Sequence, residues 1–111
     1  MNVKIDKLHL LTLVGEDNVA IGIILEEFLE NGLELLQKMC NAVSCCDEEL
    51  VREALHQLKG ASGMFGMQSL YEACVELETC PMSELSGHSM IKLREVLVKS
   101  HQLAAAAVVV G

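Results

Sequence analysis

Residues 47–66 of this 111-residue chain, DEELVREALHQLKGASGMFG, have the clearest helical pattern in the sequence. The apolar residues among them recur at steps of three and four, so they gather in one arc of a helical wheel. Asp47 is placed to cap the start of that helix, and the acidic residues Glu48 and Glu49 favour its first turn. The helix is predicted to run to about Phe65, before a turn at Gly66. The predicted buried arc consists of Leu50, Val51, Ala54, Leu58, Ala61 and Phe65, with Leu55 and Ser62 at one edge.

Helical periodicity continues on both sides of this stretch. We expect a short helix over residues 5–14, a long one over 18–44, one over 67–79 that ends at Cys80-Pro81, and a last one that follows a loop over 83–88 and runs toward residue 109. Residues 15–18 supply a break and N-cap candidates between the first two. The long helix has an apolar stripe of Ile21, Leu25, Phe28, Leu29, Leu36, Met39 and Val43. Long amphipathic helices with short connections predict an all-α fold, an antiparallel up-and-down four-helix bundle with a short extra N-terminal helix.

Composition agrees with an all-α fold and excludes several kinds of partner and site. Hydrophobic residues make up 51% of the chain but aromatic residues only 3%, which favours helices over a β-sandwich. We expect one domain over residues 1–111, acting as a cytoplasmic monomer. A net charge of −8 makes nucleic acid and anionic membranes poor partners. The five cysteines fit no disulfide or zinc spacing, so we expect reduced thiols packed as small core hydrophobes.

The face opposite the apolar arc has an unusual composition. His56 points outward there, with Gly60 and Gly63 beside it and the cations Lys59 and Arg52 on one flank. Each glycine inside a helix costs about 0.8–1 kcal/mol relative to alanine. Because exposed glycines add nothing to packing, their presence suggests that a partner approaches closely. The other interpretation, that Gly60 ends the helix as a C-cap, conflicts with the apolar period that continues past it.

The run His56-Gln57-Leu58-Lys59-Gly60-Ala61-Ser62, followed by Gly66 and Leu70, resembles the signature of histidine-containing phosphotransfer (HPt) domains. These domains are four-helix-bundle intermediates of multistep His–Asp phosphorelays. The resemblance implies that His56 is the phosphoacceptor and Lys59 the nearby cation. It also places Glu78 where many members have a glutamine near the histidine, so Glu78 is a candidate for orienting the imidazole.

The resemblance further implies a docking surface, partners and a mechanism. Receiver domains of a hybrid sensor histidine kinase and of a response regulator would dock there, with Arg52, Gln57, Gly60, Gly63 and Ile24 as candidate contacts. A neutral imidazole, with an unperturbed pKa of about 6.5, is a nucleophile at neutral pH. No cofactor of the chain's own is expected, since Mg²⁺ would come with the receiver. The sequence has no nucleotide-binding glycine loop, which argues against kinase activity.

Other interpretations of the same residues stay open. Glu53-x-x-His56 matches one half of a di-iron bundle motif, but that site needs two such pairs pointing inward. A non-catalytic helical module that binds a kinase or receiver is the main alternative function. His9, His88 and His101 are expected to be ordinary surface or edge residues. The methionines Met39, Met64, Met67 and Met90 are expected to pack in or near the core. The N-terminal Met and short flanks suggest a free-standing carrier, although a domain cut from a hybrid kinase would look the same.

Overall fold

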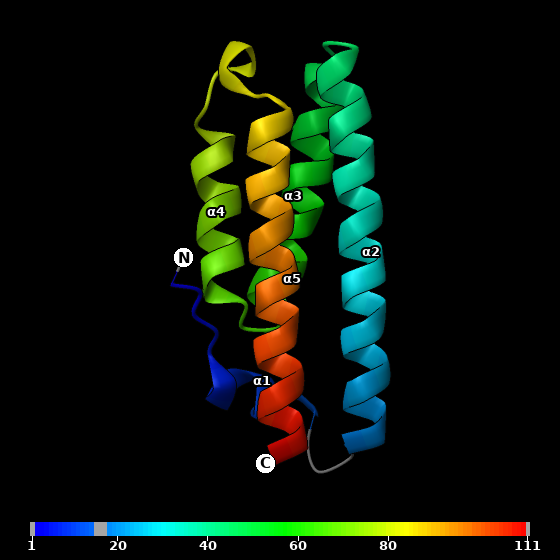
Figure 1. Cartoon of the computed structure of the whole chain (residues 1–111), viewed down its shortest axis with the longest axis vertical. Coiled ribbons are helices and arrows are strands. Elements are labelled where there is room, and N and C mark those ends of the chain that lie inside the picture. The colour runs from blue at the N-terminus through cyan, green and yellow to red at the C-terminus, as the bar shows by residue number, and fades with distance from the viewer. Residues whose placement is uncertain (1, 15–17, 111) are drawn as a thin grey trace.

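The predicted all-α architecture is confirmed by a computed structural model that describes residues 2–14 and 18–110. The elements are α1 (Lys7–Val14), α2 (Asn18–Ser44), α3 (Glu48–Met64), α4 (Gln68–Glu78), the short 3-10 helix η1 (Met82–Glu84) and α5 (Gly87–Val110). Figure 1 shows α2 to α5 running alternately up and down the long axis. Across the described ranges there is no strand. The predicted break at residues 15–17 lies outside them.

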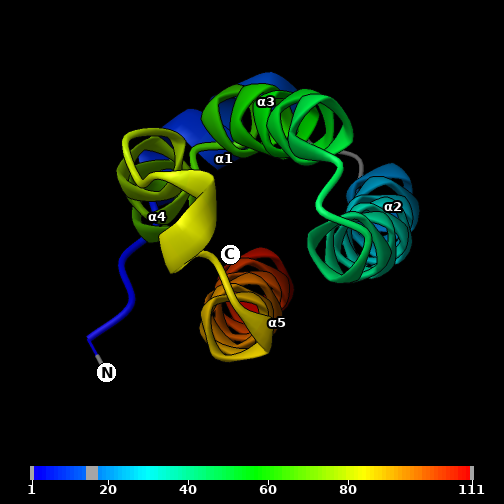
Figure 2. The ribbon, with the colours of Figure 1, turned by 90° about the horizontal axis from the view of Figure 1, so that it is seen from above.

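The four main helices enclose one large core, and a smaller cluster of Ala42, Val51 and Leu85 lies apart from it. Seen from above in Figure 2, α2 packs between α3 and α5, and α4 closes the ring between them. The described part of the chain is elongated, 44 × 23 × 17 Å, because α2 alone has 27 residues that each rise 1.5 Å. The core contains most of the stripe predicted for α2 together with apolar residues from the other helices: Ile21, Leu25, Phe28, Leu36, Met39, Leu58, Leu70, Cys74, Leu93 and Leu97.

Asp47 caps the start of α3 as predicted, since its Oδ1 accepts a hydrogen bond from the Leu50 amide at 3.1 Å. The C-terminal ends of α2 and α3 share one type of turn. After α2, Cys46 adopts a left-handed conformation with φ +55°, and after α3 Gly66 does so with φ +69°. In both turns the next residue donates its amide to a carbonyl five positions back, over 2.9 Å. These are Schellman caps, which normally have glycine at the left-handed position.

Several predicted boundaries are wrong by a few residues. The first helix begins at Lys7 because the Asp6 side chain accepts the His9 amide at 3.0 Å and caps it there. The fourth is shorter by a residue at each end, running from Gln68 to Glu78. The predicted loop over 83–88 is instead η1 followed by the start of α5 at Gly87. None of these shifts changes the topology.

Packing on two sides of α3 moves its buried face relative to the predicted arc. Leu55 and Ser62 are fully buried, although they were expected at the edge, while Leu50 is 37% exposed. The face is displaced because α3 contacts α4 as well as α2. The expectation for the cysteines is wrong for Cys45 and Cys46, which are exposed in the α2–α3 turn. Among the methionines expected to pack, Met39, Met67 and Met90 are buried, but Met64 is 61% exposed.

Over the described residues, none of the helices combines the length and the apolar character that crossing a membrane requires.

Candidate functional site

His56 lies on the solvent face of α3, as the helical wheel predicts. Its side chain is exposed and, within residues 2–14 and 18–110, its ring takes part in no hydrogen bond or ion pair. An imidazole in this state keeps a ring nitrogen free to react with a partner from solvent. The other histidines differ from it in position or partners. His9 Nε2 lies 2.9 Å from the Met64 carbonyl oxygen, His101 is largely shielded 3.5 Å from Glu26, and His88 is exposed on α5.

The two glycines near His56 are in different surroundings. A Cβ atom added to Gly60 would meet nothing within 4 Å, so this glycine leaves open space beside the histidine. A Cβ atom on Gly63 would lie 3.4 Å from the ring of Tyr71, so Gly63 faces α4 instead. Gly60 is inside α3, whose C-cap is Phe65, which contradicts the interpretation of Gly60 as a helix-ending residue.

Lys59 does not extend freely into solvent beside His56, which corrects the predicted outward face. Its Nζ lies 2.9 Å from Oε1 of Glu78 on α4, and 23% and 29% of the two side chains are exposed. The hydrogen bond to Glu78 raises the pKa of Lys59 above its usual value, with a smaller contribution from the carboxylate charge. The ammonium is therefore fully charged at neutral pH. The prediction placed Lys59 correctly along the helix but missed its partner.

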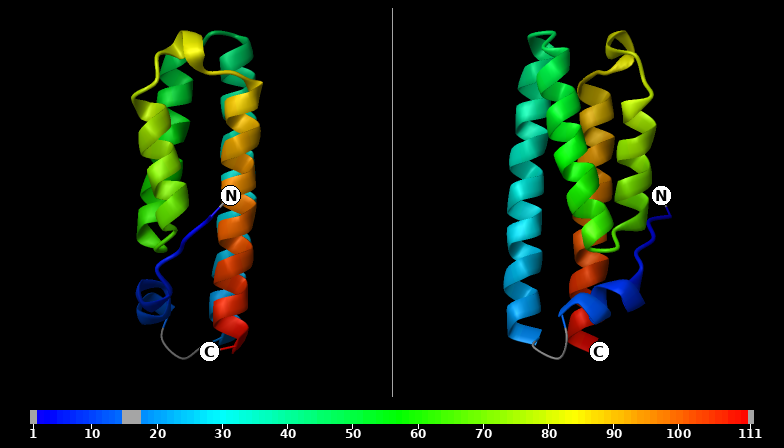
Figure 3. Two further views of the ribbon diagram at one scale, coloured as in Figure 1. Left: turned by 60° about the vertical axis from the view of Figure 1, so that its left-hand side comes forward. Right: turned by 180° about the vertical axis from the view of Figure 1, so that it is seen from behind.

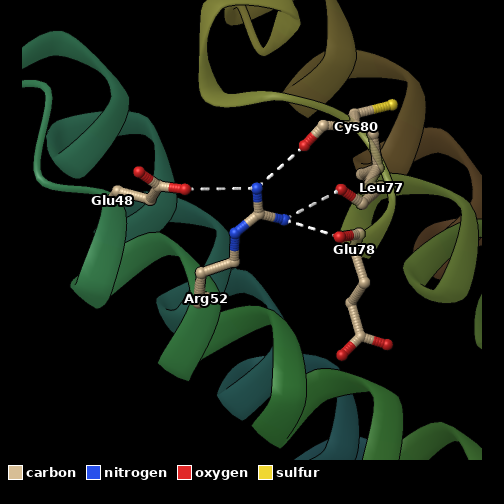
Figure 4. Close-up of polar contacts among 5 residues, drawn as sticks. All are labelled: Glu48, Arg52, Leu77, Glu78 and Cys80. Carbon is tan, nitrogen blue, oxygen red and sulfur yellow. Dashed lines mark hydrogen bonds and ion pairs between the residues drawn. The ribbon is translucent and has the colours of Figure 1, made fainter.

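Arg52 lies on the same flank of His56 as Lys59, as predicted, but its guanidinium is directed to α4 rather than outward to solvent. Figure 4 shows its guanidinium donating to the backbone carbonyl oxygens of Glu78 and Cys80, both at 2.8 Å, and of Leu77 at 3.4 Å. A weaker contact of 3.5 Å joins it to Glu48. Carbonyl groups in the last turn of a helix lack partners within the helix. Arg52 thus caps the C-terminal end of α4.

The remaining candidate contacts lie on the other side of His56, toward α2. Gln57 is exposed on α3. Ile24 is half-buried and lines a groove between α2 and α3 together with Glu27, Asn31 and Ala61. The structure therefore brings His56, Gly60, Gln57 and Ile24 to one side of the molecule. Gly63, Lys59 and Arg52 face the α3–α4 seam.

The sequence pointed to Glu78 as a candidate for orienting the imidazole, whereas the structure pairs its carboxylate with Lys59. The other members of the same α4 row, Tyr71 and Cys74, were not predicted. Tyr71, Cys74 and Glu78 are spaced by three and four positions, which puts them on one face of α4. Burial, with a smaller effect of the Glu78 charge, raises the pKa of the Cys74 thiol to about 12. Cys74 therefore stays protonated at neutral pH and is no competing nucleophile. The spacing of these residues is visible in the sequence, but it does not show which neighbouring helix this face of α4 contacts.

A metal centre finds no support in the geometry. In the part of the chain that the structure describes, no three His, Cys, Asp or Glu side chains gather as metal ligands would. Glu53 and His56 are both exposed on α3 and point outward from the bundle.

Comparison with known proteins gives two matches. The family model described as the Hpt domain matches residues 23–107, a range that includes α3, α4 and the proposed site. Sensor protein TorS of Escherichia coli (strain K12) is 30% identical over 79 residues, which is 71% of this chain and 8% of that protein. The chain thus spans a small part of the length of this relative. No solved structure gives a significant match.

Proposed function

Because this chain belongs to the Hpt domain family, whose members are phosphotransfer intermediates of two-component signalling, we propose that His56 is its phosphoacceptor. In this proposal residues 1–111 act as one such domain. His56 takes a phosphoryl group from a receiver-domain aspartate and passes it to an aspartate of another receiver. The observation that supports this most directly is the exposed imidazole, which has no hydrogen-bond or ion-pair partner among the described residues and lies next to the open space at Gly60.

The transfer needs little from the chain beyond position and charge. The lone pair of one ring nitrogen attacks phosphorus while the bond from phosphorus to the aspartate oxygen breaks, and the carboxylate leaves with the electron pair. The reverse sequence returns the group to an aspartate. Phosphoryl transfer depends mainly on alignment and on neutralising the oxygens, so Lys59, one turn from His56, would stabilise the transferred group. The acceptor aspartate and its Mg²⁺ would come from the receiver.

The surface around His56 suits a protein partner of this kind. The absence of a side chain at Gly60 lets a receiver bring its aspartate to the imidazole. The groove lined by Ile24 on α2 would supply apolar contact beside it, and Gln57 a polar one. The proposed partners are receivers of a hybrid sensor histidine kinase and of a response regulator.

The test is incubation with a panel of receiver domains that carry labelled aspartyl phosphate. Label that is acid-labile and base-stable should appear on the chain and disappear in His56→Gln, while the melting temperature stays nearly unchanged because His56 is exposed. His88→Gln, a change at another exposed histidine, should leave labelling intact. Full labelling of His56→Gln would refute the assignment.

Two further experiments test for kinase activity and for a non-catalytic interaction module. Incubation with labelled ATP and Mg²⁺ alone should give no label, since the proposal gives the chain no kinase activity. Tight binding of a phosphorylated receiver without any transfer of label would instead identify a non-catalytic interaction module.

A further inference from the structure

Glu78 pairs with the cation on which the proposed phosphoacceptor depends. Its Oε1 lies 2.9 Å from Lys59 Nζ, with less than a third of either side chain exposed. Salt and solvent weaken a shielded pair of this kind less than a fully exposed one. The resting state of the site is therefore an ion pair, with the ammonium already occupied by a carboxylate.

The other nearby cation does not neutralise this carboxylate. The Arg52 guanidinium donates to backbone carbonyl oxygens at the end of α4, and Figure 4 shows the Glu78 carboxylate pointing away from it. Within residues 2–14 and 18–110, Lys59 is the only cation within 4.0 Å of the Glu78 carboxylate. Whatever draws Lys59 away leaves Glu78 without a charged partner.

A phosphoryl group on His56 would draw Lys59 in this way. Residues three positions apart on a helix have Cβ atoms about 5–6 Å apart, so the ammonium is within reach of groups on His56. At neutral pH the phosphoryl group carries a charge of about −1.5 to −2. If Lys59 moves to it, Glu78 is left as an unpaired carboxylate in a partly shielded site. If Lys59 is shared, the carboxylate and the phosphoryl group repel each other at short range.

We propose that Glu78 competes with the phosphoryl group for Lys59 and thereby biases this carrier toward giving the group up. The proposal rests on the proposed role of His56. When the phosphorus–nitrogen bond breaks and an aspartate oxygen takes the phosphoryl group, the ring nitrogen regains its electron pair and Lys59 returns to Glu78. Glu78 is thus a positioning residue that acts through Lys59. One unit of charge acting over this range in a water-rich surface site corresponds to roughly a three- to tenfold change in the transfer equilibrium.

The test uses a receiver domain that labels the wild-type chain and measures the ratio of label on the chain to label on the receiver at the plateau. Glu78→Gln keeps the size of the side chain and removes its charge, so the ratio should rise roughly three- to tenfold. Glu76→Gln is the matched control, since it removes the same charge from an exposed position on α4, and it should leave the ratio unchanged. The melting temperatures of both variants show whether a change in folding contributes.

Repeating the Glu78 substitution in a chain that lacks Lys59 distinguishes competition for Lys59 from direct repulsion between the Glu78 carboxylate and the phosphoryl group. In Lys59→Gln, the further change Glu78→Gln should raise the ratio by less than a third of its effect in the wild-type background. An equal rise in both backgrounds, or no rise in the wild type, would overturn the proposal while the labelling of His56 still stands. If no receiver labels the wild-type chain, the proposed function itself has failed, and the role of Glu78 falls with it.

Discussion

At the scale of single residues, the candidate site depends on how far each side chain on α3 reaches. The helical wheel predicted the direction of His56 and Gly60 correctly because these positions are set by the backbone alone. It misplaced the charged ends of Lys59 and Arg52, which both bend to α4. A wheel gives the direction of Cβ, whereas a long side chain reaches several ångströms further and goes to the nearest partner. Those partners are on another helix, so the sequence alone did not show them.

Gly60 is predicted to lower the stability of the free protein while leaving room for a receiver to reach His56. Gly60→Gln should stabilise the free protein by up to about 1 kcal/mol, since glutamine is the better helix former and its Cβ would meet nothing within 4 Å. The same side chain would occupy the space beside His56, so labelling by a receiver should fall at least tenfold. Denaturant unfolding and the labelling rate measure the two effects.

Gly22→Gln is the control for this prediction. Gly22 is equally open, and it lies on α2 one turn before Glu26, which approaches His101 of α5 rather than α3. The control should gain similar stability and keep normal labelling. If Gly60→Gln labels as fast as Gly22→Gln, the glycine is not needed for access.

At the scale of elements, helix existence was predictable and helix ends were predictable only where local chemistry decides them. Asp47 begins α3 and Gly66 ends it as predicted, because a capping carboxylate and a left-handed glycine act through neighbouring backbone groups. The end of α2 was harder to predict, because Cys46 occupies the left-handed position at which a helix usually has glycine. The end of α4 was predicted to within a residue from Pro81, but its cap was not, because Arg52 is more than 20 residues away in the sequence.

Arg52 is predicted to stabilise the C-terminal end of α4 rather than to bind a receiver. Arg52→Met keeps much of the apolar stem but removes the donors to Glu78 and Cys80, so it should lower the free energy of unfolding by about 1–3 kcal/mol. Receiver labelling of the folded variant should persist. The exposed Arg94 on α5 gives the control, because Arg94→Met should change stability by less than about 0.5 kcal/mol. Unchanged stability of Arg52→Met with a loss of labelling would restore the docking role.

At the scale of the whole molecule, the bundle leaves one end open that the N-terminal segment covers. Figure 3 shows α2 and α5 extending beyond the turn between α3 and α4, with α1 lying across that end. Backbone hydrogen bonds tie the segment to the turn: the Asp6 amide donates to Gly66 over 2.7 Å, and the Ser69 amide to Lys4 over 3.0 Å. The sequence predicted a short helix but not this position. Leucines occur all around α1, so its pattern defines no single buried face, and tertiary contacts decide which leucine enters the core.

The burial of one leucine of α1 but not another gives the last prediction, in which truncating the two should change the free energy of unfolding by very different amounts. Leu10 is 1% exposed within the core cluster, whereas Leu8 is 76% exposed two positions earlier. Leu10→Ala should lower the free energy of unfolding by about 2–5 kcal/mol, because it removes buried methyl groups and leaves a cavity under α1. Leu8→Ala should change it by less than about 0.5 kcal/mol. Urea unfolding of both variants, followed by circular dichroism, measures the difference. Equal and small effects would mean that α1 is not part of the folded core in solution, and that α2 to α5 are stable without the contacts it makes.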